Sequence, residues 1–182
     1  MRNIVWVDLE ETLIDSWGEF NVIDRNINNI NKLLKKVKQT EMSVWSFAIW
    51  TENDIKRFNT NGIKQQLEEL LEFNFTNIHT IDEMKQMVEE YDQFKYNDTV
   101  EFIQLNQKLW SFVKYCLNHS NTSFWLIDDC VPNMTIQNKD SNVTINCINV
   151  NTGFEQSNST LLEYNNQLVF QSVEHFYKKY GI

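Results

Sequence analysis

Acidic and hydroxyl residues follow three apolar stretches of the chain. The first stretch ends at Asp8, the second at Thr51, and the third at the pair Asp128 and Asp129. If the stretches are parallel strands, their carboxyl ends meet at one edge of a sheet, where such proteins bind ligands. Carboxylates brought together there repel one another, and Mg²⁺ relieves that repulsion with the oxygen ligands it prefers. The sequence therefore predicts a magnesium site at this edge.

A simpler interpretation exists for each of these positions. An acid or a threonine after a strand is often a helix cap or a solvated turn residue. Considered alone, each of these positions is as consistent with a helix cap or turn residue as with a residue of a functional site. Three such positions together on strand ends favour the site.

The pattern of apolar residues predicts alternating strands and helices. Strands are expected at 3–9, 44–50, 76–81, 123–127 and 143–150, and a hairpin around Trp17 and Gly18 at 12–23. Helices are expected over 24–37 with Asp24 as cap, over 63–71, from a capping box at Asp98 and Glu101 to residue 117, and over 169–177. This alternation indicates a parallel sheet covered on both faces.

Bulk properties narrow the class of protein. A length of 182 residues suits one domain, and 42% hydrophobic residues exclude a disordered chain. The net charge of −9 argues against generic binding of nucleic acid or of an anionic membrane. The N-terminal apolar run is short and ends in acids, so neither a signal peptide nor a membrane span is expected. Three scattered cysteines fit a reducing, cytoplasmic compartment.

The residues at the strand ends resemble a known superfamily. Residues 8–15, which read DLEETLID, are similar to motif I (DxDxT) of the haloacid dehalogenase-like hydrolases. Thr51 resembles motif II, and Asp128 with Asp129 resembles motif IV, followed by a similar run at 131–133. The matches span residues 4–133 in the family's order. A response-regulator receiver domain is disfavoured, because its paired acids close the first strand.

The resemblance implies a fold and a chemistry. The fold is a haloacid dehalogenase-like Rossmannoid three-layer α/β/α sandwich with a central parallel sheet, formed as one domain over 1–182. Asp8 is the expected nucleophile, which forms an aspartyl-phosphate. Glu10 is the expected general acid and base, and Thr51 would bind a phosphoryl oxygen. Mg²⁺ would be held by Asp8, the Glu10 carbonyl and Asp128, with Asp129 in support.

Three further residues complete the predicted site, two from the resemblance and one from the expected hairpin. The family places a lysine near the start of the helix that leads into the motif IV strand, which favours Lys95 over Lys108. Thr12, from motif I, is expected to contribute to substrate binding. Trp17 could stack on a base or a sugar, or pack within the hairpin.

The family's phosphatases usually carry aspartate at the position of Glu10, whose side chain is one methylene longer. The leading hypothesis is a Mg²⁺-dependent phosphatase. The alternatives are a weak or inactive relative that binds a nucleotide or another phosphorylated ligand, and an interaction scaffold. A flap at about 12–24 and one further helix between 81 and 98 leave no room for a full cap domain. An open site suits a nucleotide, a polynucleotide end or a phosphoprotein, and the second subunit of a homo-oligomer could cover it.

Overall fold

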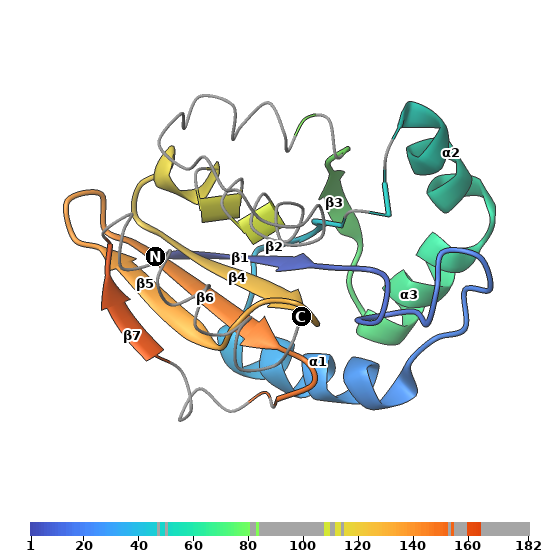
Figure 1. Ribbon diagram of the computed structural model, residues 1–182, viewed down its shortest axis with the longest axis horizontal. Helices are drawn as coiled ribbons and strands as arrows, with labels where there is room; N and C mark the ends of the chain where they lie inside the picture. Colours follow the sequence, from blue (N-terminus) through green and yellow to red (C-terminus); the bar gives the residue numbers. More distant parts are fainter. Residues whose placement is uncertain are drawn as a thin grey trace, which may run out of the picture.

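The computed structural model describes residues 1–46, 48–49, 51–80, 83, 108–109, 112–113, 115–152, 154 and 160–164. The chain forms an α/β fold around a seven-stranded sheet in the order β3-β2-β1-β4-β6-β5-β7 (Figure 1). The strands are β1 (Arg2–Val7), β2 (Glu41–Val44), β3 (Phe75–Ile78), β4 (Thr122–Asp128), β5 (Met134–Asn138), β6 (Val143–Asn149) and β7 (Thr160–Glu163). The helices with complete bounds are α1 (Asp24–Val37), α2 (Glu52–Thr60) and α3 (Ile63–Leu71).

Strand β1 lies in the middle of the parallel part of the sheet. It pairs in parallel with β2 on one side and β4 on the other, while β3 and β6 extend the parallel part outward. Only β5 runs antiparallel to its neighbour β6, with β7 parallel to β5 at the edge. The predicted central strand ending at Asp8 is confirmed. Its last four residues are buried, as expected for a strand covered on both faces.

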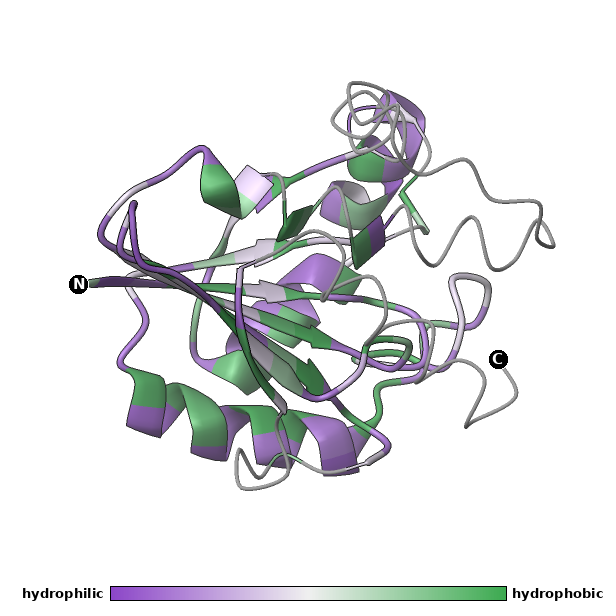
Figure 2. Cartoon of the chain, turned by 60° about the vertical axis from the view of Figure 1, so that its left-hand side comes forward, coloured by the Kyte–Doolittle hydropathy of each residue, from purple (hydrophilic) through white to green (hydrophobic). Residues whose placement is uncertain are grey.

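Helices cover both faces of the sheet, which gives three layers. One face packs on α1 and α3, and Figure 2 shows α1 turning its apolar side to the sheet. The other face packs on helical residues 108–109, 112–113 and 115–117. Successive residues of β1 serve the two cores in turn, because alternate side chains of a strand point to opposite faces. This arrangement is compatible with a Rossmann-like sandwich.

The predicted strand over 44–50 is wrong. Strand β2 ends at Val44, although the Trp45 amide still donates to the carbonyl of Val7 at 2.8 Å. The chain then turns at Ser46, whose hydroxyl accepts from the Ala48 amide at 3.2 Å. This turn ends the pairing with β1, and Ala48 and Ile49 are buried without belonging to a strand.

Two smaller expectations also differ from the structure. Asp24 does not cap α1, since Ile23 is the N-cap and Asp24 is the first helical residue. The expected hairpin is a looped flap with a single antiparallel bridge between Ile14 and Val22. The capping box at 98 and 101, the helix at 169–177 and the expected cap segment between 81 and 98, apart from residue 83, lie outside the described residues.

Candidate active site

Asp8 and Asp128 lie side by side at the carboxyl ends of β1 and β4. The two strands pair in register up to Val7 and Ile127, so the acids follow at matching positions. The Asp8 amide donates to the carbonyl of Ile127 at 2.9 Å and continues the ladder. Both side chains are buried, with relative exposures of 4% and 0%. The sheet therefore brings together two of the acids that the sequence singled out.

Lys108 joins the two carboxylates from the helix above the sheet. Its Nζ lies 3.0 Å from Asp8 Oδ1 and 2.5 Å from Asp128 Oδ2, and the residue is only 5% exposed. The fully buried Trp45 donates its indole N–H to the backbone carbonyl of Lys108 at 3.1 Å. This hydrogen bond fixes the backbone from which the Lys108 side chain extends. Lys95, the first candidate from the sequence, lies outside the described residues.

The electrostatics of this cluster show an excess of negative charge. Burial alone would lower the pKa of Lys108, but the surrounding carboxylates outweigh burial and hold it above its ordinary value. Burial raises the pKa of Asp128 even though Lys108 opposes the shift. Burial and the charges of Asp128 and Asp8 raise the pKa of Asp129 to about 7. Among the residues that the structure describes, one ammonium therefore faces three carboxylates and does not balance them.

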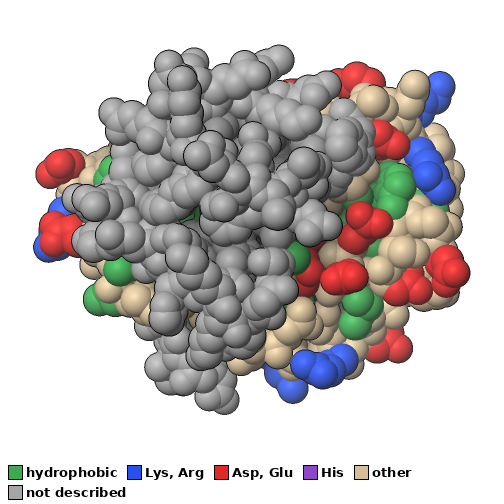
Figure 3. All heavy atoms as spheres, in the orientation of Figure 1, with side chains coloured by type: hydrophobic (Ala, Val, Ile, Leu, Met, Phe, Trp, Pro, Cys, Tyr) green, Lys and Arg blue, Asp and Glu red, His purple; other side chains and the backbone are tan. Residues whose placement is uncertain are grey.

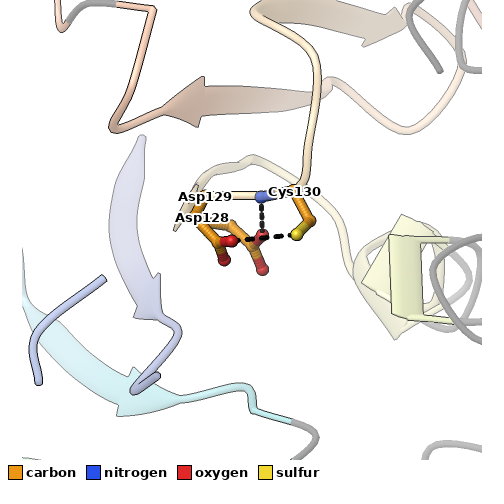
Figure 4. Close-up of side chains that lie close together, drawn as sticks. All are labelled: Asp128, Asp129 and Cys130. Carbon is orange, nitrogen blue, oxygen red and sulfur yellow. Dashed lines mark hydrogen bonds between the residues drawn. The ribbon is translucent and has the colours of Figure 1, made fainter. Parts of the chain in front are cut away.

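The turn after β4 places Asp129 and Cys130 beside Asp128 (Figure 4). The Cys130 amide donates to Asp128 Oδ1 at 2.6 Å, and its thiol donates to Asp129 Oδ2 at 2.9 Å. Burial and the two neighbouring carboxylates raise the pKa of the Cys130 thiol far above its ordinary value. The sulfur therefore stays protonated and serves as a hydrogen-bond donor.

Asn149 holds this turn in place from the end of β6. Its position matches that of Asp128 in the neighbouring strand, and the residue is buried. The Asn149 side-chain amide donates to the carbonyls of Asp129 at 2.7 Å and Val131 at 2.8 Å. Asn149 was not predicted as a site residue, although it is a polar residue at the end of an apolar strand, as are the acids that the sequence identified.

Two hydroxyl residues follow β2. Ser46 lies two residues after the end of the strand and is buried, with 1% exposure. Thr51 is exposed and caps α2, where its hydroxyl donates to Asp54 Oδ2 at 3.0 Å and accepts from the Asp54 amide at 3.4 Å. Ser46 is therefore the first hydroxyl residue after the strand, and it was missed because the predicted strand ran too far.

The remaining predicted site residues lie in and around the flap. Glu10 is half-buried, and its Oε1 accepts a hydrogen bond from the Trp17 amide at 2.7 Å. Thr12 is fully buried, and its carbonyl accepts from the Asn26 side chain at 2.9 Å. The Trp17 ring packs within the protein, 6.1 Å from the ring of Phe58 between centroids. The flap thus contacts the Glu10 carboxylate through the backbone amide of Trp17.

A cation could be held at the end of β4. The ligand atoms of Asp128, Asp129 and Cys130 lie within 4.8 Å of one another. Because the thiol is protonated, the carboxylate oxygens are the available donors, with Asp8 across the strand pair. Oxygen donors with excess negative charge suit a hard divalent cation such as Mg²⁺.

Comparison with known proteins assigns no family. No protein-family model matches the chain, and neither a curated protein nor a solved structure matches it. Within the part of the chain that the structure describes, no helix has the length and apolar character to cross a membrane. Inference about function therefore rests on the site itself, where two buried carboxylates share one ammonium beside a third carboxylate.

Proposed function

We propose that this chain is a haloacid dehalogenase-like phosphatase, which hydrolyses phosphomonoesters through an aspartyl-phosphate on Asp8 with Mg²⁺ as cofactor. The observation that carries the proposal is the buried Lys108 ammonium between Asp8 and Asp128 at adjacent strand ends. The central position of β1 supports it, since ligands bind at the carboxyl ends of parallel strands.

The proposed steps use Asp8 and Lys108 of the cluster together with Glu10, two residues after Asp8. An Asp8 oxygen attacks phosphorus and forms the aspartyl-phosphate, while Glu10 gives a proton to the departing alkoxide. Glu10 then accepts a proton from the water that attacks the phosphorus of this intermediate, which releases phosphate and restores Asp8. Lys108 stabilises the charge on the phosphoryl oxygens throughout.

The residues present fit Mg²⁺. The raised pKa values of Asp128 and Asp129 result from negative charge held in a buried place, and a divalent cation would compensate that charge. Asp8, Asp128 and the Glu10 carbonyl would hold the ion, with Asp129 in support. When bound, the ion would neutralise charge on the phosphoryl group.

We assign the phosphoryl-binding lysine to Lys108 and extend the hydroxyl role from Thr51 to Ser46. Lys108 already contacts the proposed nucleophile at 3.0 Å. Ser46 follows the strand next to β1 and is buried, whereas the Thr51 hydroxyl is engaged in capping α2. A Ser46→Ala variant should therefore lose more activity than a Thr51→Ala variant.

Phosphate release from a panel of phosphomonoesters tests the proposal. The panel should include nucleotides, 5′- and 3′-phosphorylated oligonucleotides, phosphopeptides and an aryl phosphate, each with and without Mg²⁺. Asp8→Asn is the matched control, because it keeps the shape of the side chain and removes the nucleophile. We expect Mg²⁺-dependent release that Asp8→Asn abolishes. Release that survives this substitution would overturn the role of Asp8.

A second candidate function is binding of a phosphorylated ligand without turnover. The observation that favours it is the Glu10 carboxylate, which the Trp17 amide holds at 2.7 Å. In that case the wild type is inert, a phosphorylated ligand raises its melting temperature, and Glu10→Asp gains hydrolysis. In a working enzyme, Glu10→Asp instead leaves activity unchanged or lowers it. The response to this substitution therefore separates the two candidates.

A further inference from the structure

A cation and three aromatic rings connect the flap to α2. The Trp17 ring lies 5.3 Å from Phe20 and 6.1 Å from Phe58 between centroids, and Phe58 is fully buried in α2. The guanidinium of Arg57, the residue before Phe58, lies over both flap rings. Its Cζ is 5.6 Å from the Trp17 centroid and 4.9 Å from that of Phe20. These distances are within the range of cation–π attraction.

The same tryptophan contacts the proposed general acid. The Trp17 amide donates to Glu10 Oε1 at 2.7 Å, while its ring contacts both Phe58 and Arg57. Backbone and ring belong to one residue, so contacts that hold the ring also restrict the backbone that carries the amide. The position of the Glu10 carboxylate therefore depends on contacts made by α2.

The base of the flap is held by different interactions. The Asp15 carboxylate accepts from the Asn21 amide at 3.0 Å and from the Asn21 side chain at 2.7 Å. The Ile23 amide donates to the Leu13 carbonyl at 2.9 Å. Loss of the Arg57 contact should therefore loosen the flap around Trp17 and leave its base folded.

We infer that Arg57 is a positioning residue, which acts through the Trp17 ring to fix the Glu10 carboxylate for proton transfer. The inference rests on the proposed function, because it takes Glu10 as the general acid and base. Arginine suits the task, since its planar guanidinium stacks on aromatic faces, while a lysine ammonium is a compact, strongly hydrated charge.

Hydrogen exchange of the Trp17 amide tests the contact without any need for activity. We expect Arg57→Ala to speed this exchange roughly 5- to 30-fold, from the loss of two cation–π contacts. Arg57→Lys keeps the charge and should fall between Arg57→Ala and the wild type. The matched control is Lys56→Ala, which removes an exposed cation from the neighbouring position of α2. Equal exchange in Arg57→Ala and Lys56→Ala would overturn the inference.

Kinetics with two leaving groups test the consequence for proton transfer. An alkyl phosphate needs the general acid and an aryl phosphate needs it little. Arg57→Ala should therefore lower kcat for the alkyl phosphate roughly 3- to 10-fold more than for the aryl phosphate, with Lys56→Ala unchanged. An equal loss on both substrates, or a change in KM alone, would assign Arg57 to substrate binding instead.

The hydrogen-exchange and kinetic measurements can contradict the role of Arg57 and the phosphatase proposal independently of each other. A wild type that hydrolyses neither substrate would remove the phosphatase proposal and the proton-transfer role with it. Faster Trp17 exchange in Arg57→Ala would still show that Arg57 fixes the flap on Glu10. Normal hydrolysis with unchanged exchange would remove the role of Arg57 and leave the phosphatase proposal intact.

Discussion

Replacing Lys108 by methionine should destabilise the fold strongly. Methionine keeps the length and apolar stem of the side chain but removes the charge that Asp8 and Asp128 share. Breaking a buried ion pair by removing one partner costs about 3–5 kcal/mol, because the remaining charge is left uncompensated. For a chain of this size, that loss corresponds to a melting temperature roughly 6–20 °C lower.

The pH dependence of the stability of Lys108→Met should show whether uncompensated carboxylate charge causes the loss. Burial already raises the folded-state pKa of Asp128, and loss of the ammonium raises it further. A carboxyl group whose pKa is higher in the folded than in the unfolded state lowers the free energy of unfolding. This destabilisation is complete at pH values above the folded-state pKa. That penalty disappears below the unfolded value of about 4. The difference in stability between Lys108→Met and wild type should therefore shrink as the pH falls from 7 towards 4.

The assay is urea unfolding at several pH values, with Lys139→Met as the matched control. Lys139 pairs with Glu163 at 3.1 Å, but both side chains are about two-thirds exposed, so this pair should contribute about 0–1 kcal/mol. Added Mg²⁺ should recover part of the loss in Lys108→Met, because a cation at the same carboxylates offsets the same charge. Equal stability of the two variants at pH 7 would refute the view of Lys108 as the balancing charge.

Three further outcomes are expected. Asn149→Ala should lower the free energy of unfolding by about 2–4 kcal/mol in urea, since the carbonyls of Asp129 and Val131 lose their donor. Trp45→Phe should cost about 1–2 kcal/mol in the same assay, because the ring is kept while the donor to the Lys108 carbonyl is lost. The buried thiols of Cys116 and Cys147, whose pKa values burial raises, should react with a thiol reagent only after unfolding; fast labelling of the native protein at pH 8 would contradict this.

The sequence predicts the centre of the sheet well and its borders poorly. β1, β4 and β6 are apolar runs buried on both faces, so their composition identifies them. The run over 44–50 has the same composition for another reason: Trp45 and Ile49 are buried in opposite cores while the chain turns between them. Apolar content alone does not separate these two cases. β5 and β7 are short strands of five and four residues beside the parallel part, and the analysis missed both.

The same limits apply to the candidate site. Convergence of Asp8 and Asp128 follows from strand order alone, because both residues end neighbouring parallel strands. Choosing the lysine requires knowing how far the preceding helix extends and which turn of it faces the strand ends. A position counted from an expected helix start favoured Lys95, which lies outside the described residues, whereas the structure shows Lys108 at the carboxylates. Tertiary geometry, which no local pattern encodes, decides that choice.

The charged carboxylates of Asp8 and Asp128, at the carboxyl ends of β1 and β4, give no evident stabilisation of the fold. Two residues earlier on the same face, Trp6 and Leu126 are fully buried and apolar. Apolar side chains at Asp8 and Asp128 would continue that core, and replacing buried ion pairs by well-packed apolar groups is often neutral or stabilising. In the described part of the chain, the cluster instead holds three carboxylates against the Lys108 ammonium, and burial together with Asp128 and Asp8 raises the pKa of Asp129 to about 7. The unbalanced charge therefore favours the proposed function over an interaction scaffold, because a phosphoryl group bound together with a cation would compensate it.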